Sequence, residues 1–147
     1  MTRIKVKVKA RRSWPLKWRK GIENTVRWGI YRLGISQEDI TILVRLKGRS
    51  SENDYGSCIQ LTENKYIISL FAGHSLGRVI STIFHELTHV KQHLRDDFVM
   101  MERGAIWRSY FIVYDKKDYW QLPWEIEARE SEKILRKEFA NLAKNNS

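Results

Sequence analysis

Residues 84–93 read FHELTHVKQH, and within them His85, Glu86 and His89 have the spacing H-E-x-x-H. On an α-helix, side chains four positions apart lie on one face, one turn apart. Two imidazoles in this relation can bind a single zinc ion at the usual bond length of about 2.0 to 2.1 Å. Glu86 lies beside that point and can reach a water there without binding the ion, as a general base requires.

The surrounding residues predict an amphipathic helix from about Leu76 to Arg95. Its apolar positions gather on one broad arc: Leu76, Val79, Ile80, Ile83, Phe84, Leu87, Val90 and Leu94. The polar residues, among them His85 and His89, form a stripe on the opposite side. The two histidines therefore do not belong to the apolar face, which favours a metal site over an ordinary amphipathic helix.

A third metal ligand has to come from elsewhere in the chain. His93 lies two turns beyond His85, about 12 Å along the helix axis, which is too far for the same ion. The stretch LPWEIEA at residues 122–128 offers two carboxylates, Glu125 and Glu127, at the start of a second predicted helix. The two glutamates point to different faces of that helix.

HELTHVKQ followed by PWEIEA resembles the small zincin-type metallopeptidases of phages and their hosts, in the group whose third zinc ligand is a glutamate. In that family the ligand glutamate precedes a small residue by three positions, and Glu125 and Ala128 match this relation. The resemblance therefore implies Glu125, and not Glu127, as the third ligand. It covers roughly the C-terminal half of the chain, whereas the basic N-terminal third matches only as a strand–helix–strand outline.

The resemblance implies a zinc-dependent endopeptidase acting on a polypeptide substrate. His85, His89 and Glu125 would bind Zn²⁺, and Glu86 would be the general base toward a metal-activated water. The family also has an edge strand that binds an extended peptide. KYIISLFAG, residues 65–73, stands where that strand is expected, and it can equally be an ordinary strand of the sheet.

Other expected features of the site are less specific. The family places an acidic residue four positions after the ligand glutamate to orient a histidine, but here that position is Arg129, so Glu130, Asp96 or a backbone carbonyl would have to serve. Candidates to donate to the oxyanion of the reaction are His74, Tyr110, Tyr114 and Tyr119, and the sequence assigns none of them. Aromatic residues expected in the wall of the cleft or in the core are Trp107, Trp120 and Trp124.

The whole pattern predicts an α+β fold with one core, a single zincin-like domain over residues 1–147. Expected strands cover residues 3–9, 40–48, 57–61 and 65–71, and the last two are expected to pair across the short turn at residues 62–64. Expected helices run from near Pro15 to Gly34 and from Pro123 to near the C-terminus. Residues 107–122 are expected to form either a hairpin turning at residues 115–118 or aromatic-rich irregular structure. A small mixed or antiparallel sheet would pack on helices, and the H-E-x-x-H helix and the C-terminal helix would form the metal site.

Composition narrows the class of protein further. Cys58 is the single cysteine among 147 residues, which excludes an internal disulfide and a cysteine-rich zinc finger and favours a reducing compartment. No apolar run is long enough to cross a bilayer, and the basic N-terminus does not resemble a signal peptide. We therefore expect a cytoplasmic protein, in the host cytoplasm if a phage encodes it, with no membrane contact. The sequence does not indicate an oligomeric state.

The formal net charge of +10 is concentrated early in the chain. Nine basic residues stand in the first twenty: Arg3, Lys5, Lys7, Lys9, Arg11, Arg12, Lys17, Arg19 and Lys20. They are either a solvated surface or a contact for nucleic acid or another polyanion. Trp14 and Trp18 among them either stack on bases or pack in the core.

The charge supports two alternative functions. One is a basic nucleic-acid-binding module with a structural metal, although that reading gives no reason for Glu86 to stand between two ligand histidines. The other is a phage structural or assembly protein of the same fold, in which peptidase chemistry is lost or secondary.

Overall fold

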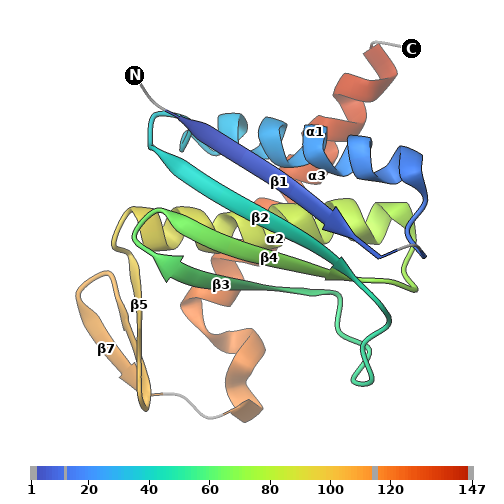
Figure 1. Ribbon diagram of the computed structural model, residues 1–147. Helices are drawn as coiled ribbons and strands as arrows, with labels where there is room; N and C mark the ends of the chain where they lie inside the picture. The colour runs from blue at the N-terminus through green and yellow to red at the C-terminus, as the bar shows by residue number, and fades with distance from the viewer. Residues whose placement is uncertain (1–2, 12, 114–115, 146–147) are drawn as a thin grey trace.

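The computed structural model describes residues 3–11, 13–113 and 116–145 (Figure 1). The elements follow in this order: β1 (Ile4–Ala10), α1 (Leu16–Arg32), β2 (Ile40–Lys47), β3 (Gly56–Thr62), β4 (Lys65–Phe71), α2 (Leu76–Leu94), β5 (Phe98–Met101), β6 (Gly104–Trp107), β7 (Tyr110–Val113), the 3₁₀ helix η1 (Lys116–Gln121) and α3 (Pro123–Asn145). The predicted α+β class is confirmed. None of the described helices is long and apolar enough to cross a membrane.

The main sheet has four strands in the order β1-β2-β4-β3. β1, β2 and β4 are parallel, and β3 runs antiparallel to β4, with which it forms a hairpin as the first of the two strands. The predicted pairing of residues 57–61 with 65–71 is therefore confirmed. Of the two alternatives for residues 65–73, the ordinary strand of the sheet is confirmed and the peptide-binding edge strand is wrong, because β4 has a partner on each side. The edge strand on that side of the sheet is β3.

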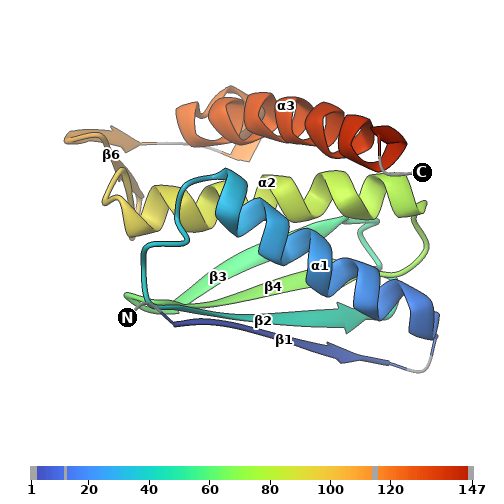
Figure 2. The ribbon, with the colours of Figure 1, turned by 90° about the horizontal axis from the view of Figure 1, so that it is seen from above.

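Helices α1 and α2 cover one face of this sheet, and α3 lies over α2 on the side away from the strands (Figure 2). The main core fills the space between strands and helices, with fully buried residues such as Val26, Ile42, Ile68, Phe84 and Leu87. Helix α2 is therefore covered on two sides. This arrangement explains why part of its predicted polar stripe is buried, including Thr82, His89 and Gln92.

A second, smaller sheet of order β5-β6-β7 follows α2 and contributes to a separate apolar cluster. The described chain therefore has a small second hydrophobic cluster besides the single core that was predicted. In it the rings of Phe98 and Trp124 stack with centroids 4.7 Å apart, and Trp107 packs beside them. This cluster connects the small sheet to the first turn of α3. Two of the three tryptophans expected in the cleft or core, Trp107 and Trp124, thus lie in a core.

The expected hairpin turn at residues 115–118 is wrong. The chain turns between β6 and β7 at Arg108 and Ser109, whose φ angles are +48° and +76°, and residues 116–118 belong to η1. Asp115 and Tyr114 lie outside the described residues. Tight hairpin turns with positive φ usually contain glycine, asparagine or aspartate. Because Arg and Ser stand here instead, the sequence does not mark the position of this turn.

Candidate metal centre

Helices α2 and α3 bring the predicted ligands together. Ser75 caps the start of α2 by accepting a hydrogen bond from the backbone N–H of Arg78, and Pro123 stands in the first turn of α3, where its missing N–H costs nothing. Polar bonds fix the two helices to each other: Thr88 Oγ1 donates to Ser131 Oγ at 3.0 Å, and Arg136 donates to Ser81 Oγ at 2.6 Å. The polar stripe of α2 is thus its contact surface with α3.

His85, His89 and Glu125 form the only group of potential metal ligands found among the described residues, with ligand atoms all within 4.8 Å of one another. Nε2 of His85 lies 3.0 Å from Glu125 Oε2, and Nε2 of His89 lies 3.0 Å from Glu125 Oε1. The carboxylate is almost completely buried, at 2% exposure. The structure therefore gathers the three predicted ligands in one place.

The other nitrogen of each imidazole is held by a residue that the sequence analysis did not single out. Nδ1 of His85 donates to Glu132 Oε1 at 3.0 Å, and Nδ1 of His89 donates to Gln92 Oε1 at 2.8 Å. The amide of Gln92 is oriented because its nitrogen donates to Trp124 O and to Glu127 Oε1. These partners fix both rings with Nε2 toward Glu125, which is the orientation that ligand histidines need.

Glu130 and Asp96, the side chains expected to orient the histidines, do not contact them. Glu130 is exposed on α3, and Asp96 lies beyond the end of α2 at a positive φ of 57°. Glu127, the alternative third ligand, bonds Gln92 and pairs with Arg108, so it orders the site from outside the ligand group. His93 also lies outside the ligand group, as predicted. Its ring stacks on Phe98 with ring centroids 4.9 Å apart.

The donor and acceptor pattern at this point favours a cation. Since each Nδ1 carries its proton toward an acceptor, a neutral imidazole presents the lone pair of Nε2 to the Glu125 carboxylate, which has no proton to give. Lone pairs facing each other at 3.0 Å repel unless a proton or a metal ion lies between them. Two imidazole nitrogens and one carboxylate are a donor set that suits zinc, so the residues present fit such an ion.

Without metal, protons have to take that place, and the pKa values respond accordingly. Burial by itself lowers the pKa of His85, but hydrogen bonds to Glu125 and Glu132 outweigh it and raise the pKa to about 10. The pKa of His89 is also raised, because the hydrogen bond to Glu125 overcomes the effect of burial. Burial would raise the pKa of Glu125, yet its bonds to both histidines hold it well below the usual value.

Glu86 lies beside the ligand group and is not part of it. Its side chain is buried at 8% exposure, and we find no hydrogen bond that its carboxylate accepts from another described residue. Burial raises the pKa of Glu86, opposed by the charges of His89 and His85. The structure thus holds a carboxylate with an elevated proton affinity, unengaged, next to the candidate ligands.

A cleft of about 650 Å³ opens onto His85 and Glu86. One wall is the segment from Asn53 to Gly56, which leads into the edge strand β3, and the other includes Tyr119 and Trp120 of η1. The hydroxyl of Tyr119 donates to Glu125 Oε1 at 2.7 Å. The third expected wall residue, Trp120, is therefore at the mouth of the cleft.

The residues expected to donate to the oxyanion lie at different distances from the candidate ligands. Tyr119 reaches the ligand group, whereas Tyr110 is 75% exposed on β7. His74 packs edge-on against Tyr55 of the cleft wall, with ring centroids 4.7 Å apart, and its Nε2 bonds Asp54 O. Tyr114 lies outside the described residues.

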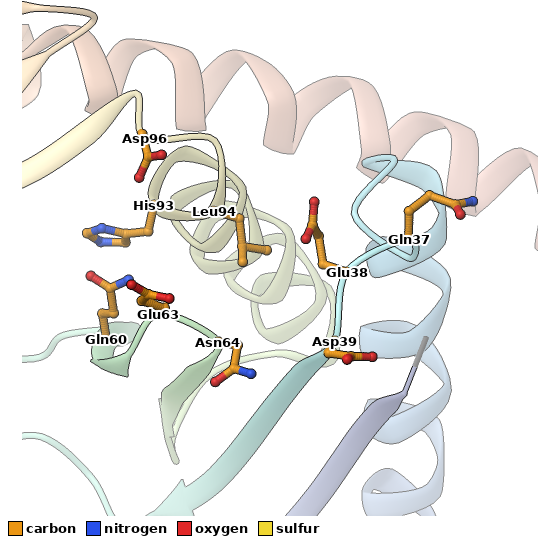
Figure 3. A pocket seen from close by; sticks show the side chains of 9 residues that line it. All are labelled: Gln37, Glu38, Asp39, Gln60, Glu63, Asn64, His93, Leu94 and Asp96. Atoms are coloured by element: carbon orange, nitrogen blue, oxygen red, sulfur yellow. The ribbon is translucent and has the colours of Figure 1, made fainter. Parts of the chain in front are cut away.

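A second pocket, of about 610 Å³, lies at the far end of β3 (Figure 3). Its acidic residues are Glu38 and Asp39 of the α1–β2 loop, Glu63 of the β3–β4 turn and Asp96 beyond α2, and they do not converge on one point. No metal-ligand group is found there within the described part of the chain. The candidate site is therefore the cleft at His85 and not this pocket.

Comparison with protein family models, with curated proteins and with solved structures gives no match to this chain. The functional argument consequently depends on the geometry of the site.

Proposed function

We propose that this protein is a zinc-dependent endopeptidase in which Glu86 is the general base. The observation that carries the proposal is the position of Glu86: an unengaged, buried carboxylate adjoining the His85, His89 and Glu125 group and lining the same cleft as His85. A structural metal site requires no such residue. Structural zinc sites also commonly use four protein ligands, whereas the described residues supply three here, which leaves a position for water.

The chemistry supplied by bound zinc is Lewis acidity, which lowers the pKa of water toward 7 and polarises a carbonyl group. Glu86 would accept the proton of the attacking water and deliver it to the departing amine. Its raised pKa suits this exchange, since a base that is too acidic cannot hold the proton between the two steps. Tyr119, which bonds Glu125, is the tyrosine of the described chain placed to assist at the carbonyl oxygen.

A polypeptide is the substrate class that the cleft supports best. The outer edge of β3 is unpaired in the sheet, and its first residue, Gly56, lines the cleft. An extended peptide could add to this edge through main-chain hydrogen bonds and run past Glu86. The choice of β3 replaces the expectation that residues 65–73 would bind the peptide.

The test compares the zinc-loaded wild type with Glu86→Gln and with Glu130→Gln, a matched change at an exposed glutamate of α3. Cleavage of fluorescein-labelled denatured casein and of a mixed peptide library is followed together with zinc content. We expect Glu86→Gln to keep its zinc and to lose about 10²- to 10⁴-fold in rate, while Glu130→Gln keeps both. Wild-type turnover in the Glu86→Gln variant would overturn the assignment of the base.

Removal of a ligand distinguishes the metal site from the base. His85→Ala is expected to lose both zinc and cleavage, because two ligands hold the ion far less tightly than three. Metal analysis of the wild type also identifies the ion, since two histidines and a carboxylate accept iron(II) as well as zinc. If the protein binds no divalent metal, the proposal is wrong at its first step.

A further inference from the structure

The face of the main sheet turned away from α1 and α2 carries a concentration of positive charge. Val6, Val44 and Ile68 point into the core, so their neighbours along each strand point to the opposite face, because side chains alternate in a β-strand. Those positions hold six basic residues: Lys5, Lys7 and Lys9 of β1, Arg45 and Lys47 of β2, and Lys65 of β4. We call this set the basic sheet face.

No helix or strand of the described chain covers the basic sheet face; Figure 1 looks onto it, with α1 and α2 behind the strands. The four strands contain no Asp or Glu. None of the six basic side chains forms an ion pair with another described residue. The charge of this face is therefore uncompensated within the structure described.

This arrangement costs stability. Lys9 lies directly across from Arg45 in the β1–β2 register, and like charges at such positions repel. One alternative explanation for the lysines of the edge strand β1 is that they prevent edge-to-edge pairing with another chain. That explanation does not extend to Arg45 and Lys47, because β2 is paired on both sides. An anionic partner accounts for the whole set.

The spacing of the charges favours a nucleic acid duplex. Alternate residues of a parallel strand are about 6.6 Å apart, and neighbouring strands lie about 4.8 Å apart. The phosphates of a nucleic-acid strand form a regular row of charges, and a B-form duplex presents two such rows, with about one charge per 1.7 Å of helix axis. Lys5, Lys7 and Lys9 thus form a line that can follow the phosphates of one strand, with Arg45 and Lys47 beside them.

Single-stranded nucleic acid and membranes fit this face less well. Binding of single strands uses exposed aromatic rings, but Trp14 is 3% exposed and donates its indole N–H to Lys47 O, and Trp18 packs against the core. Of the two expectations for these tryptophans, packing is therefore confirmed: Trp14 lies in the core and Trp18 packs against it. A membrane contact requires apolar residues that insert, and the large apolar side chains exposed on the strands of the main sheet, Ile59 and Leu61, lie on β3 at the opposite edge from β1.

We propose that the basic sheet face binds double-stranded DNA through its phosphates, without reading base sequence. The binding site differs from the expected one, since it draws on β1, β2 and β4 and not on the N-terminal region alone. It lies on the sheet face opposite α2, whose residues form the metal centre, so DNA and the cleft can be occupied independently.

The test measures binding of the full-length protein to a fluorescein-labelled 20-base-pair duplex by anisotropy over a range of salt concentrations. Lys5→Thr/Lys7→Thr/Lys9→Thr removes three charges from the basic sheet face at positions where threonine suits a strand. Lys17→Gln/Lys20→Gln/Lys137→Gln removes three charges from exposed positions of α1 and α3 and serves as the matched control. Circular dichroism verifies that both variants fold.

We expect the β1 variant to bind at least about tenfold more weakly at low salt, and its slope of log affinity against log salt to fall by about three, one for each lost phosphate contact. The control should retain most of the affinity and the slope. Arg45→Thr, a single change on β2, should lower the slope by about one. Zinc content is a further readout, expected to be unchanged in all three variants.

Three results would overturn the proposal. Equal losses in the two triple variants would show that net charge alone attracts DNA. Tighter binding of a 20-nucleotide single strand than of the duplex would indicate base stacking. Sedimentation with vesicles containing phosphatidylserine, in the absence of duplex binding, would assign the face to a membrane surface.

Discussion

Nδ1 of His85 lies 3.0 Å from Oε1 of Glu132, which follows the ligand Glu125 by seven residues on α3. Seven residues are nearly two helical turns, so both glutamates point from α3 toward the same histidine. One carboxylate faces Nε2 of His85 and the other faces Nδ1. A single helix thus supplies both a candidate ligand and the residue that orients another candidate ligand.

Glu132→Ala tests this relationship. We expect zinc affinity to fall by about 10- to 100-fold, because His85 loses the acceptor that fixes its ring and raises its basicity as a ligand. The measurement is competition with a zinc chelator of known affinity. Glu130→Ala, two residues earlier and exposed, is the control and should bind zinc as the wild type does. Equal affinities in the two variants would mean that Glu132 has no part in the metal centre.

Gln92→Leu is expected to destabilise the fold as well as the site. Gln92 is fully buried and bonds His89, the backbone carbonyl of Trp124 and Glu127. Leucine would leave the buried Nδ1–H of His89 without its acceptor and would remove the bonds to Trp124 O and Glu127, at a cost of about 2–4 kcal/mol in the free energy of unfolding. Urea denaturation of the metal-free protein measures this cost. The exposed Gln121→Leu serves as control, and a loss below about 0.5 kcal/mol at Gln92 would contradict the network.

The success and failure of the sequence-based predictions follow from the range of the interactions involved. The helix with His85 and His89 and the alternation in β1 are local periodicities, and both were predicted within a residue or two of the observed bounds. Glu125 depended on a spacing to Ala128, which is fully buried. The two periodicities are encoded in short stretches, so a single sequence suffices to find them, whereas the choice of Glu125 over Glu127 came from the family resemblance.

The residues that orient the histidines could not be chosen in the same way. Gln92 is three positions after His89 and Glu132 is seven after Glu125, so both spacings were available in the sequence. Which polar residue meets an imidazole depends, however, on how α3 crosses α2, and that crossing is a tertiary property. The same limit explains the wrong edge strand, since strand order in a sheet is not local.

The stability of the metal-free protein should depend on pH through the metal ligands. The folded-state pKa of His85 is raised to about 10 and that of His89 is raised, against about 6.5 in an unfolded chain. The folded state then binds more protons than the unfolded state above pH 6.5. The stabilisation is therefore complete below about pH 6.5 and is lost as the pH rises toward about 10.

Glu125 acts at the acidic end. Its pKa is lowered in the folded state, so its contribution is present above about pH 4.3 and lost as the pH falls further. Urea denaturation in EDTA should consequently show greatest stability near pH 5 to 6.5. Zinc replaces the protons between the ligands, so the zinc-loaded protein should lack most of the decline above pH 6.5. A free energy of unfolding in EDTA that does not change between about pH 6.5 and 10 would contradict the raised pKa values of His85 and His89.

Two glycines of α1 test how closely this helix packs on α2. An added Cβ at Gly29 would lie 2.6 Å from Cδ1 of Leu87 and 3.4 Å from a ring carbon of Phe84, whereas nothing lies within 4 Å of a Cβ at Gly21. Alanine favours a helix by about 1 kcal/mol at either position. Gly21→Ala should therefore stabilise the protein by about 0.5–1 kcal/mol, measured by urea denaturation.

Gly29→Ala should instead destabilise it by about 1–2 kcal/mol, because overpacking a core outweighs the gain in helix propensity. The clash falls on Phe84 and Leu87, the residues that flank His85 and Glu86 on α2. A shift of Leu87 that relieves it would move the helix turn bearing the base, so cleavage should fall in Gly29→Ala and stay unchanged in Gly21→Ala. Equal stability gains in both variants would show that the α1–α2 contact has room for a methyl group.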